Sequence, residues 1–409
     1  MTELPAQRVL MVAPEPFFTP RGTPMNVAQM CRVLTSKGLQ IDLVTYPLGE
    51  PFDLPGLTIH RAPGIPGIRS VPIGFSWRKV MLDISLFFKL LSLLVRKRYS
   101  FVHAIEESVF LVLPLTWLGV SMVYDLDSLI SDQLKYSGTV RARPLLRGAR
   151  WLERTALRRS IAAITVCQAL SDAVRDMSPA TSVFQVEDCP LQDSLRPPDP
   201  DAVEAIRERL GLAGRQTIVY TGNLESYQGM DLLLDSAAIL ADSHPAATFL
   251  LLGGSKSDVD KLQQSIASRS LSGSIRCLGH QPSTDLPEWM DLADVLVSPR
   301  VQGDNTPLKI YTYMYTAKPI VATDLLTHTQ VLDGSMAILT APTPEGLAAG
   351  LGRALDQPEE AQQLGTKARQ IAQAEYGQEA FADKLLAAYN ALLTDPSFPD
   401  RERVSPRSD

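Results

Sequence analysis

The stretch Ser298 to Met314 reads SPRVQGDNTPLKIYTYM and marks the end of a buried strand and the start of a helix. The apolar run 294–297 precedes it, Thr306 is expected to be the helix N-cap, and Pro307 to be the first helical residue. Free backbone N–H groups and the positive end of the helix dipole then point at one spot, where Arg300 and Lys309 add two full charges. The stretch predicts a site for the diphosphate of a nucleotide; the alternative is an ordinary capped helix with solvated Arg and Lys.

Strands and helices alternate on the N-terminal side of this stretch, as expected for a parallel sheet. A strand at 8–13 leads through a loop with three prolines and Gly22 to a helix that starts at Thr23 and stops at Gly38, and the strand 40–45 follows. The loop leaves the carboxyl end of the first strand, where open α/β sheets bind ligands. Further strands are expected at 57–61, 101–105, 121–125, 163–167 and 181–186.

A second series of strands and helices follows a proline-rich connection at 191–214. Strands are expected at 217–221, 248–252, 274–278, 294–297 and 320–322, and helices at 230–241, 257–268, 345–355 and 359–374. The expected fold class is therefore α/β, with two Rossmann-like doubly wound domains that face each other across a cleft. We expect an N-terminal domain at 1–190, a C-terminal domain at 191–376, a helix at 377–393 that packs back toward the first domain, and a disordered tail at 394–409.

Length and composition describe a soluble chain of two domains. The 409 residues are 45% hydrophobic and 21% charged, with a net charge of -6. Residues 1–190 carry 21 Lys and Arg against 16 Asp and Glu, which leaves 18 against 29 for the remainder, so the first half is basic and the second acidic. The four cysteines lie far apart, without metal-ligand spacing, and no signal-type segment opens the chain, which predicts a cytoplasmic protein with no metal site. No nucleic-acid partner is expected.

Several segments together match one known family. They are the Pro-rich loop with Gly22, Val219 to Leu224 followed by Gly229 to Leu233, Leu251 to Gly254, and Thr306 to Lys309 through Lys318 to Thr323. Over about residues 8–392 the chain resembles the family 4 glycosyltransferases of the group 1 type, which are retaining enzymes of the GT-B architecture. The resemblance implies a hexosyltransferase-type enzyme that uses a UDP- or GDP-linked sugar without a metal or other cofactor. Its N-terminal domain would bind the acceptor and its C-terminal domain the nucleotide.

The resemblance also implies the residues of the site. Asp127, Asp304 and Gly22 are expected to be catalytic, with Gly22 allowing the loop to approach the donor phosphate closely. The expected donor-binding residues are Gly222, Asn223, Arg300, Thr306, Pro307, Leu308, Lys309 and Thr312. No general base is needed if the departing phosphate takes the acceptor proton.

Three features of the family pattern are altered. Its two glutamates eight residues apart fall on Asp304 and Thr312, and its basic pair falls on Asn223 and Gln228, so Arg300 and Lys309 are expected to hold the diphosphate. A histidine that the family often has in its first domain falls on Asp127. Asp127 could bind a sugar hydroxyl, or it could cap the next helix.

The first half also carries two features that predict contact with an acceptor or a membrane. Arg143, Arg147, Arg150, Arg154 and Arg158 recur along one helix face, with Leu145, Ala149, Leu152 and Ala156 opposite. An anionic lipid surface or polyanionic acceptor would bind such a helix, and a solvated Arg face is the alternative. The apolar run 80–95 is too short to span a bilayer and predicts a buried or membrane-resting helix.

Two histidines and the choice between enzyme classes remain open. His103 could line the acceptor side or be a satisfied core histidine, and His328 could reach the cleft. The expected function is transfer of a sugar to a lipid-linked or envelope glycan acceptor by a protein peripheral on the inner face of the cell membrane. The alternatives are a nucleotide-sugar epimerase or hydrolase on the same fold and a non-catalytic nucleotide-sugar binder.

Overall fold

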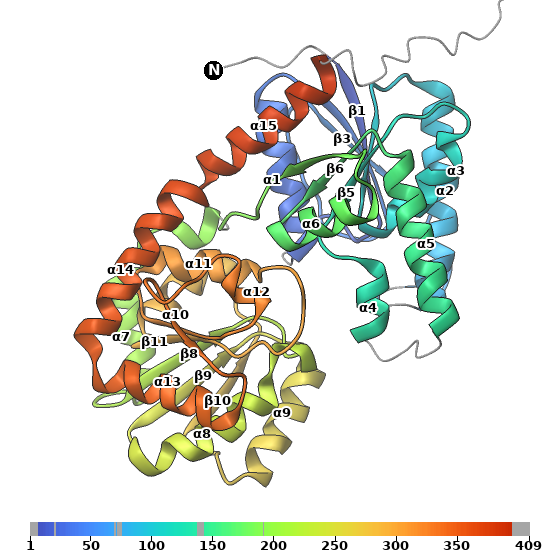
Figure 1. Cartoon of the computed structure of the whole chain (residues 1–409). Coiled ribbons are helices and arrows are strands. Elements are labelled where there is room, and N and C mark those ends of the chain that lie inside the picture. Colours follow the sequence, from blue (N-terminus) through green and yellow to red (C-terminus); the bar gives the residue numbers. More distant parts are fainter. Residues whose placement is uncertain are drawn as a thin grey trace, which may run out of the picture. The chain divides into compact units, whose positions relative to one another are not determined.

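A computed structural model describes residues 7–19, 22–68, 71, 76–136, 143–190 and 192–394. These residues form two α/β units (Figure 1). The first unit runs up to Glu187 and resumes at Phe381, and the second is Asp188–Ala380. Both limits lie within a few residues of the expected boundaries at 190 and 376. The expected disordered tail, 394–409, lies outside the described residues except for Thr394.

The first unit contains a parallel sheet of seven strands in the order β3-β2-β1-β4-β5-β6-β7. The order reverses at β1, so the carboxyl ends of β1 and β4 mark the point where open α/β sheets bind ligands. The strands are β1 (Arg8–Ala13), β2 (Gln40–Thr45), β3 (Leu57–Arg61), β4 (Val102–Ile105), β5 (Met122–Leu126), β6 (Ala162–Thr165) and β7 (Ser182–Gln185).

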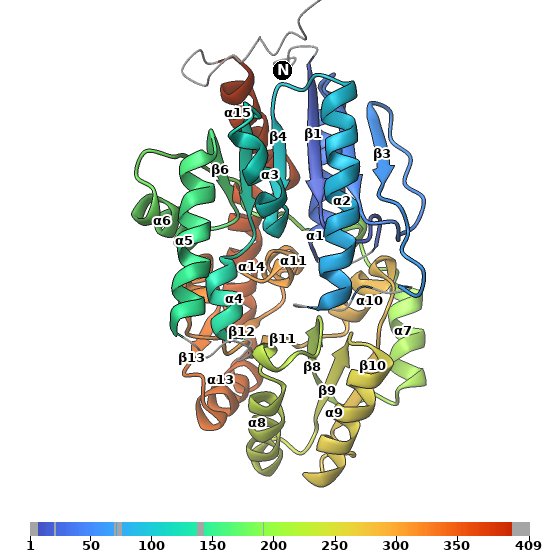
Figure 2. The ribbon, with the colours of Figure 1, turned by 90° about the vertical axis from the view of Figure 1, so that its right-hand side faces the viewer.

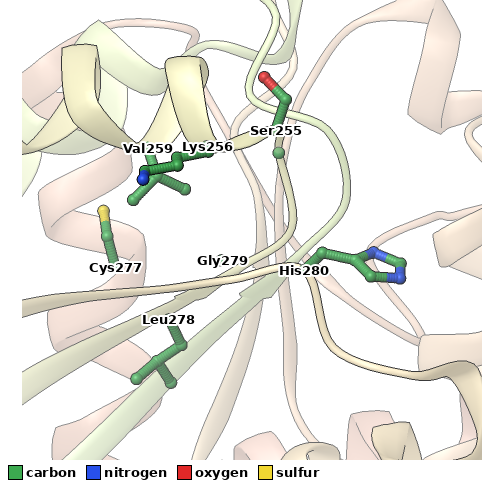
Figure 3. A pocket seen from close by; sticks show the side chains of 8 residues that line it. Ser255, Lys256, Val259, Cys277, Leu278, Gly279 and His280 are labelled. Carbon is green, nitrogen blue, oxygen red and sulfur yellow. The ribbon is translucent and has the colours of Figure 1, made fainter.

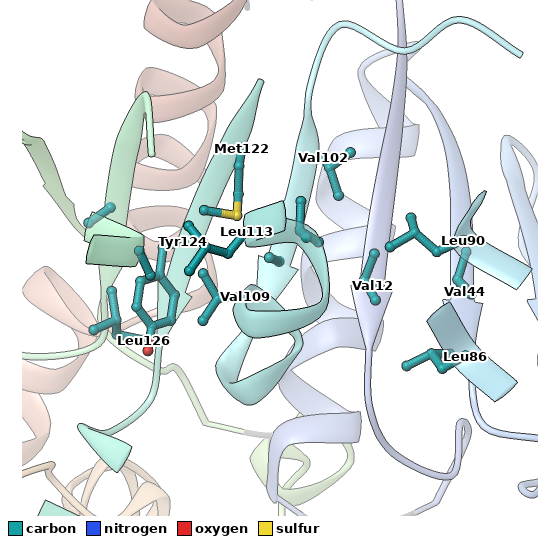
Figure 4. Packing of buried hydrophobic residues seen from close by; sticks show 14 of the residues in the cluster. Val12, Val44, Leu86, Leu90, Val102, Val109, Leu113, Met122, Tyr124 and Leu126 are labelled. Carbon is teal, nitrogen blue, oxygen red and sulfur yellow. The ribbon is translucent and has the colours of Figure 1, made fainter. Parts of the chain in front are cut away.

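Helices cover both faces of this sheet. They are α1 (Gly22–Ser36), α2 (Trp77–Arg96), α3 (Val109–Thr116), α4 (Ile130–Tyr136), α5 (Arg143–Arg159), α6 (Gln168–Met177) and, from the end of the chain, α15 (Gln378–Thr394). Two perpendicular views agree that α2, α3 and α5 lie on one face of the sheet (Figures 1 and 2). Val12, Val102, Tyr124 and Leu86 belong to the core on that face (Figure 4).

Side chains alternate along each strand, so residues between these core positions face the other way. His103 of β4, which lies between Val102 and Ala104, contacts Tyr389 of α15. The last helix of the chain therefore covers the opposite face of the first sheet. Among the described residues, no helix is both long and apolar enough to span a bilayer.

The second unit contains a parallel sheet of six strands in the order β10-β9-β8-β11-β12-β13. Its order reverses between β8 and β11, which places a second ligand-binding edge at their carboxyl ends. The strands are β8 (Gln216–Thr221), β9 (Ala247–Leu252), β10 (Ile275–Gly279), β11 (Val295–Ser298), β12 (Ile320–Thr323) and β13 (Ile338–Thr340).

Helices on the two faces of the second sheet bury two separate apolar clusters. One cluster lies under α8 and α13 and the other under α10, α11 and α14. The helices are α7 (Pro200–Arg209), α8 (Met230–Ser243), α9 (Lys256–Ser268), α10 (Leu286–Asp291), α11 (Leu308–Thr316), α12 (Leu326–Thr329), α13 (Pro344–Asp356) and α14 (Pro358–Glu375). The two doubly wound sheets confirm the expected α/β class, whereas β13, α10 and α12 were not expected.

Candidate functional site

The candidate donor site lies where α11 begins. Pro307 has φ -64° and ψ 133°, so it is the N-cap and the helix starts at Leu308. The predicted N-cap, Thr306, is therefore one residue too early, because the extended ψ of Pro307 keeps it out of the helix while its carbonyl accepts from the Ile310 N–H at 2.9 Å. The Thr306 side chain is 3% exposed, and its hydroxyl has no hydrogen-bond partner in the described part of the chain. A polar ligand at this helix end could satisfy that hydroxyl.

Lys309 presents its ammonium group at the same helix end. Its Nζ atom donates to Oε1 of Gln228 at 3.0 Å and lies 3.8 Å from the ring centroid of Tyr220. Within the described residues no carboxylate forms an ion pair with it. Burial, and next the positive charge of Arg300, hold the pKa of Lys309 well below its usual value. An anion bound here would relieve both effects.

Arg300 leaves the end of β11 and organises the loop that precedes α11. Its side chain is 7% exposed, and it donates to the Gln302 carbonyl at 2.7 Å and to both the carbonyl and the side-chain oxygen of Asn305. A side chain at Gly303, which has φ +126°, would collide with the guanidinium. Arg300 therefore fixes the loop and also places a positive charge beside Lys309.

Two glycines bring the backbone close to the Lys309 ammonium. Gly222 follows β8 with φ +138°, and a Cβ atom there would lie 2.8 Å from the Lys309 Nζ atom. Gly253 follows β9 with φ +119°, and a Cβ atom there would collide with the Gly222 carbonyl oxygen. Asn223, the next predicted donor residue, donates to the Tyr227 hydroxyl at 3.0 Å. The ends of β8 and β9 therefore meet beside α11.

A hollow of about 410 Å³ opens at the same edge of the sheet, at the ends of β9 and β10 (Figure 3). It begins at Gly254, the residue after Gly253, and reaches the exposed side chain of His280. The other lining residues are Ser255, Lys256, Val259, Cys277, Leu278 and Gly279. The hollow thus adjoins the Gly222–Gly253 contact.

Other predicted residues of the second unit lie around this edge. Asp304 is half-buried in the loop, and its main-chain oxygen accepts from Gln330 at 2.7 Å. Thr312 is 7% exposed within α11, and Leu308 is half-buried. Gln228, at a position where the family has a basic residue, accepts the hydrogen bond from Lys309. At this position an uncharged side chain therefore accepts a hydrogen bond from Lys309 instead of supplying a positive charge.

His328 lies below this edge and is fully buried. Its Nε2 atom lies 2.8 Å from the Ser298 hydroxyl, and its Nδ1 atom lies 2.9 Å from the Thr323 carbonyl. Burial lowers the pKa of His328 to about 3. The residue is therefore a neutral support for the end of β11, and the expectation that it reaches a cleft is wrong.

In the first unit, Asp127 and Gly22 lie at the carboxyl edge of the sheet. Asp127 follows β5 and accepts a hydrogen bond from the Thr23 hydroxyl of α1 at 3.1 Å. Gly22 is the exposed first residue of α1, and a Cβ atom built on it would have no neighbour within 4 Å. A different carboxylate, that of the buried Glu153, accepts from the Ser131 N–H in the first turn of α4. Asp127 thus connects β5 to the start of α1.

Sequence reasoning assigned no role to Glu106 and Glu107, two adjacent glutamates at the end of β4. Glu106 directly follows β4 and has φ +48°, and Glu107 forms an ion pair with Lys79. Burial, and next the charge of Asp127, raise the pKa of Glu106 well above its usual value. The signal that could have identified them is two adjacent acids at the carboxyl end of a strand beside the switch in strand order.

His103 is a core residue. It is fully buried, with Nε2 2.9 Å from an Asp125 carboxylate oxygen and Nδ1 2.7 Å from the Tyr389 hydroxyl. Because Asp125 accepts, Nε2 carries the proton and Nδ1 accepts from the tyrosine. The hypothesis that His103 lines an acceptor surface is therefore wrong.

The arginine helix is α5, and its apolar face differs from the expected one. Arg147 and Arg150 are exposed, Arg154 donates to the Met177 carbonyl at 2.9 Å, and the Arg143 side chain lies outside the described part. Leu145 is 62% and Leu152 37% exposed, so the predicted apolar face is only partly buried. The buried side carries Glu153, Ala156 and Leu157.

Comparisons with known proteins agree with this architecture. Residues 215–357, which include β8, Lys309 and the loop before α11, match the family described as "Glycosyl transferases group 1". The matched segment lies within the second unit. Sucrose-phosphate synthase from Thermosynechococcus elongatus has a similar structure, with TM-score 0.78 and 18% identity over 94% of this chain and 99% of that one. The expected GT-B fold and the resemblance to group 1 glycosyltransferases are confirmed.

Two curated relatives match part of the chain, and another solved structure contains a bound nucleotide sugar. Alpha-D-kanosaminyltransferase from Streptomyces kanamyceticus is 26% identical over 60% of this chain and 64% of its own length. A lipopolysaccharide core biosynthesis mannosyltransferase from Rhizobium leguminosarum is 26% identical over 48% of this chain and 56% of its own length. The chain thus spans less than two thirds of either relative. The Anabaena HepE structure with UDP-glucose has TM-score 0.73 and 16% identity over 94% of this chain and all of that one.

The described part of the second unit shows no metal-binding cluster. Across the residues that the structure describes, no three His, Cys, Asp or Glu side chains are grouped so that they could hold an ion. The charges gathered at α11 are those of Arg300 and Lys309. The site geometry therefore fits an anion bound by protein cations and N–H groups.

Proposed function

We propose that the chain is a retaining glycosyltransferase that uses a UDP- or GDP-linked sugar, without a metal ion, and transfers the sugar to a lipid-linked or envelope glycan acceptor. The observation that carries the donor part is the Lys309 ammonium. Among the described residues it contacts the neutral Gln228 amide and the Tyr220 ring, and it forms no ion pair with a carboxylate. A diphosphate would supply the opposite charge. The Thr306 hydroxyl, which has no partner among the described residues, and the first N–H groups of α11 would add hydrogen bonds.

The same groups could stabilise the leaving group. Negative charge develops on the diphosphate as its bond to the sugar breaks, and fixed cations and N–H dipoles favour that charge more in a partly buried site than in water. Lys309 would bind a phosphate oxygen, while Arg300 would act through its charge and by holding the loop. Asp304 would contact the donor sugar. The departing phosphate would take the acceptor proton.

The remaining parts of the donor and acceptor are proposed from neighbouring features. The hollow at the ends of β9 and β10 would accept the base or the ribose, because it adjoins the Gly222–Gly253 contact beside Lys309. The HepE complex with UDP-glucose and the name of the Rhizobium mannosyltransferase support the donor class and an envelope acceptor. Asp127 and Gly22 would be catalytic residues contributed by the acceptor-binding unit. The protein would act in the cytoplasm at the inner face of the membrane.

The test is turnover of a panel of UDP- and GDP-sugars by the full chain and by Lys309→Met. Methionine keeps the stem over Tyr220 but removes the charge, so kcat/KM should fall by about a hundredfold. Lys367→Met is the matched control, because Lys367 is exposed on α14. Nuclear magnetic resonance of the product should show retained anomeric configuration.

Three other results would contradict the proposal. Unchanged turnover by Lys309→Met would refute the assigned diphosphate site. Nucleotide-sugar binding without turnover or hydrolysis would indicate a binding protein. An isomerised nucleotide sugar would indicate an epimerase.

A further inference from the structure

Helix α2 is apolar on two opposite sides. The inward side buries Leu82, Leu86, Leu90 and Leu93 in the core of the first unit. The opposite side carries Trp77, Val80, Met81, Ile84, Phe88 and Val95, which are 40% to 86% exposed. These residues recur at intervals of about one or two helical turns, so they form one stripe along the helix. A surface helix normally has polar residues there, so this stripe requires an apolar partner.

Aromatic and basic side chains extend this surface across the neighbouring helices. Trp117, just after α3, is 57% exposed, and Trp151 of α5 is 65% exposed. Arg159 lies over the Trp117 ring at 5.0 Å, and Arg78 lies over the Trp77 ring at 5.9 Å. Because α2, α3 and α5 lie on the same face of the sheet (Figure 2), these features belong to one face.

The charges on α2 and α5 are mostly positive. Arg78, Lys89 and Arg96 flank the apolar stripe of α2, whose one acid, Asp83, accepts from the Tyr46 hydroxyl at 2.5 Å. On α5, Arg147 and Arg150 are exposed, and the one acid, Glu153, is fully buried. The exposed charge of this face is therefore positive, although the whole chain carries -6.

We propose that this face, the outer stripe of α2 with Trp117, Trp151 and the exposed arginines of α5, docks on an anionic lipid bilayer. The stripe would enter the headgroup region with α2 lying in the membrane plane, and the arginines would contact anionic headgroups. Tryptophan suits the boundary between headgroups and acyl chains. This inference deepens the proposed function, because it would bring the acceptor-binding unit to a lipid-linked acceptor.

A bilayer fits the face better than a second copy of the chain does. Two copies joined through this face would bring their arginines together, and like charges oppose such contact. The α2 stripe extends over a helix of 20 residues, about 30 Å long at 1.5 Å per residue. An anionic bilayer can bind the entire stripe and its flanking cations at once.

The experiment compares binding of the full chain to vesicles of phosphatidylcholine and to vesicles that also contain phosphatidylglycerol. We expect binding to the anionic vesicles that weakens with added salt. Three of the four tryptophans are exposed and Trp289 is 3% exposed, so bromine-labelled acyl chains should quench most of the fluorescence. The double variant Trp77→Ser/Phe88→Ser should bind at least about tenfold more weakly, because two large apolar side chains would no longer leave water on binding.

Two further variants make the result specific. Arg147→Glu/Arg150→Glu should weaken binding to anionic vesicles, and Leu326→Ser, at a 53% exposed site in the second unit, should leave it unchanged. The docking proposal is overturned if the full chain does not bind anionic vesicles or if neither double variant weakens binding. A dimer in solution that Trp77→Ser/Phe88→Ser dissociates would also overturn it, in favour of a second copy. Nucleotide-sugar turnover without vesicles is measured separately, so it tests the proposed function alone.

Discussion

His328 supports the candidate donor site as an uncharged imidazole. Its pKa is about 3 in the folded chain against 6.5 for the free side chain. The unfolded chain therefore binds more protons between these values, so the stability that this residue contributes is present above pH 6.5 and falls as the pH drops toward 3. The loss approaches about 1.4 kcal/mol for each pH unit. His328→Gln should destabilise the second unit at pH 7, and the difference from the unmodified chain should shrink at pH 5.

Urea unfolding followed by tryptophan fluorescence at the two pH values measures this difference, because Trp289 lies in the second unit. His280→Gln, at an exposed histidine, is the control and should show the same small effect at both values. An equal destabilisation by His328→Gln at pH 7 and pH 5 would show that the imidazole is not kept neutral by the fold.

At the scale of an element, one glycine sets how α11 packs on α14. Ala317 ends α11 with φ +60°, and Gly365 in the middle of α14 lies against this end. A Cβ atom at Gly365 would collide with the Ala317 carbonyl oxygen and lie 2.6 Å from that of Lys318. Gly365→Ala should therefore lower the free energy of unfolding by about 1–3 kcal/mol, although alanine favours helices.

The control is the same change in another helix. Gly148 lies inside α5, and a Cβ atom there has no neighbour within 4 Å, so Gly148→Ala should stabilise the first unit by up to about 1 kcal/mol. Thermal unfolding of both variants measures the two effects. If Gly365→Ala stabilised the chain as Gly148→Ala is expected to do, the description of α11 as closely packed against Gly365 of α14 would be contradicted.

Local sequence patterns predicted elements well where burial and turn chemistry agree. The strands β1, β2 and β3 have the expected bounds, because each is a short segment bounded by glycine or proline turns. The three-residue β13 was missed because it is too short to show a period. The cap of α11 was placed at Thr306 because threonine is a common cap, whereas the backbone of Pro307 decides the position.

At the scale of the whole molecule, α15 completes the core of the unit where the chain began. Tyr389 stacks on His103 with the ring planes 23° apart and donates its hydroxyl to Nδ1. Tyr389→Phe would leave a buried acceptor without a donor, so it should cost about 1–3 kcal/mol. Hydrogen exchange should then become faster in β4 and β5 and stay unchanged in β9. Asn390→Ala, at an exposed position of α15, is the control, and equal exchange in both variants would contradict this role.

The partners of Lys309 and His103 could not be predicted from the sequence, because they come from distant segments of the chain. The spacing around Lys309 indicated a charged helix start, but the partners Gln228 and Tyr220 come from about 80 to 90 residues earlier. For His103, the pattern of β4 does not show that a helix almost 290 residues later covers it. The exposed apolar stripe on α2 could not be predicted either, because the sequence of an apolar helix does not show which side packs against the core.

The placement of α15 also has a consequence for synthesis. A ribosome delivers residues 188–380 before Tyr389 exists, so the second unit can finish folding while the first waits with one face of β4 uncovered. Translation must pass α15, which ends at Thr394, before the nascent first unit can close. A transcript cut short after the second unit would therefore yield one complete folded body and one that chaperones and proteases recognise as unfinished.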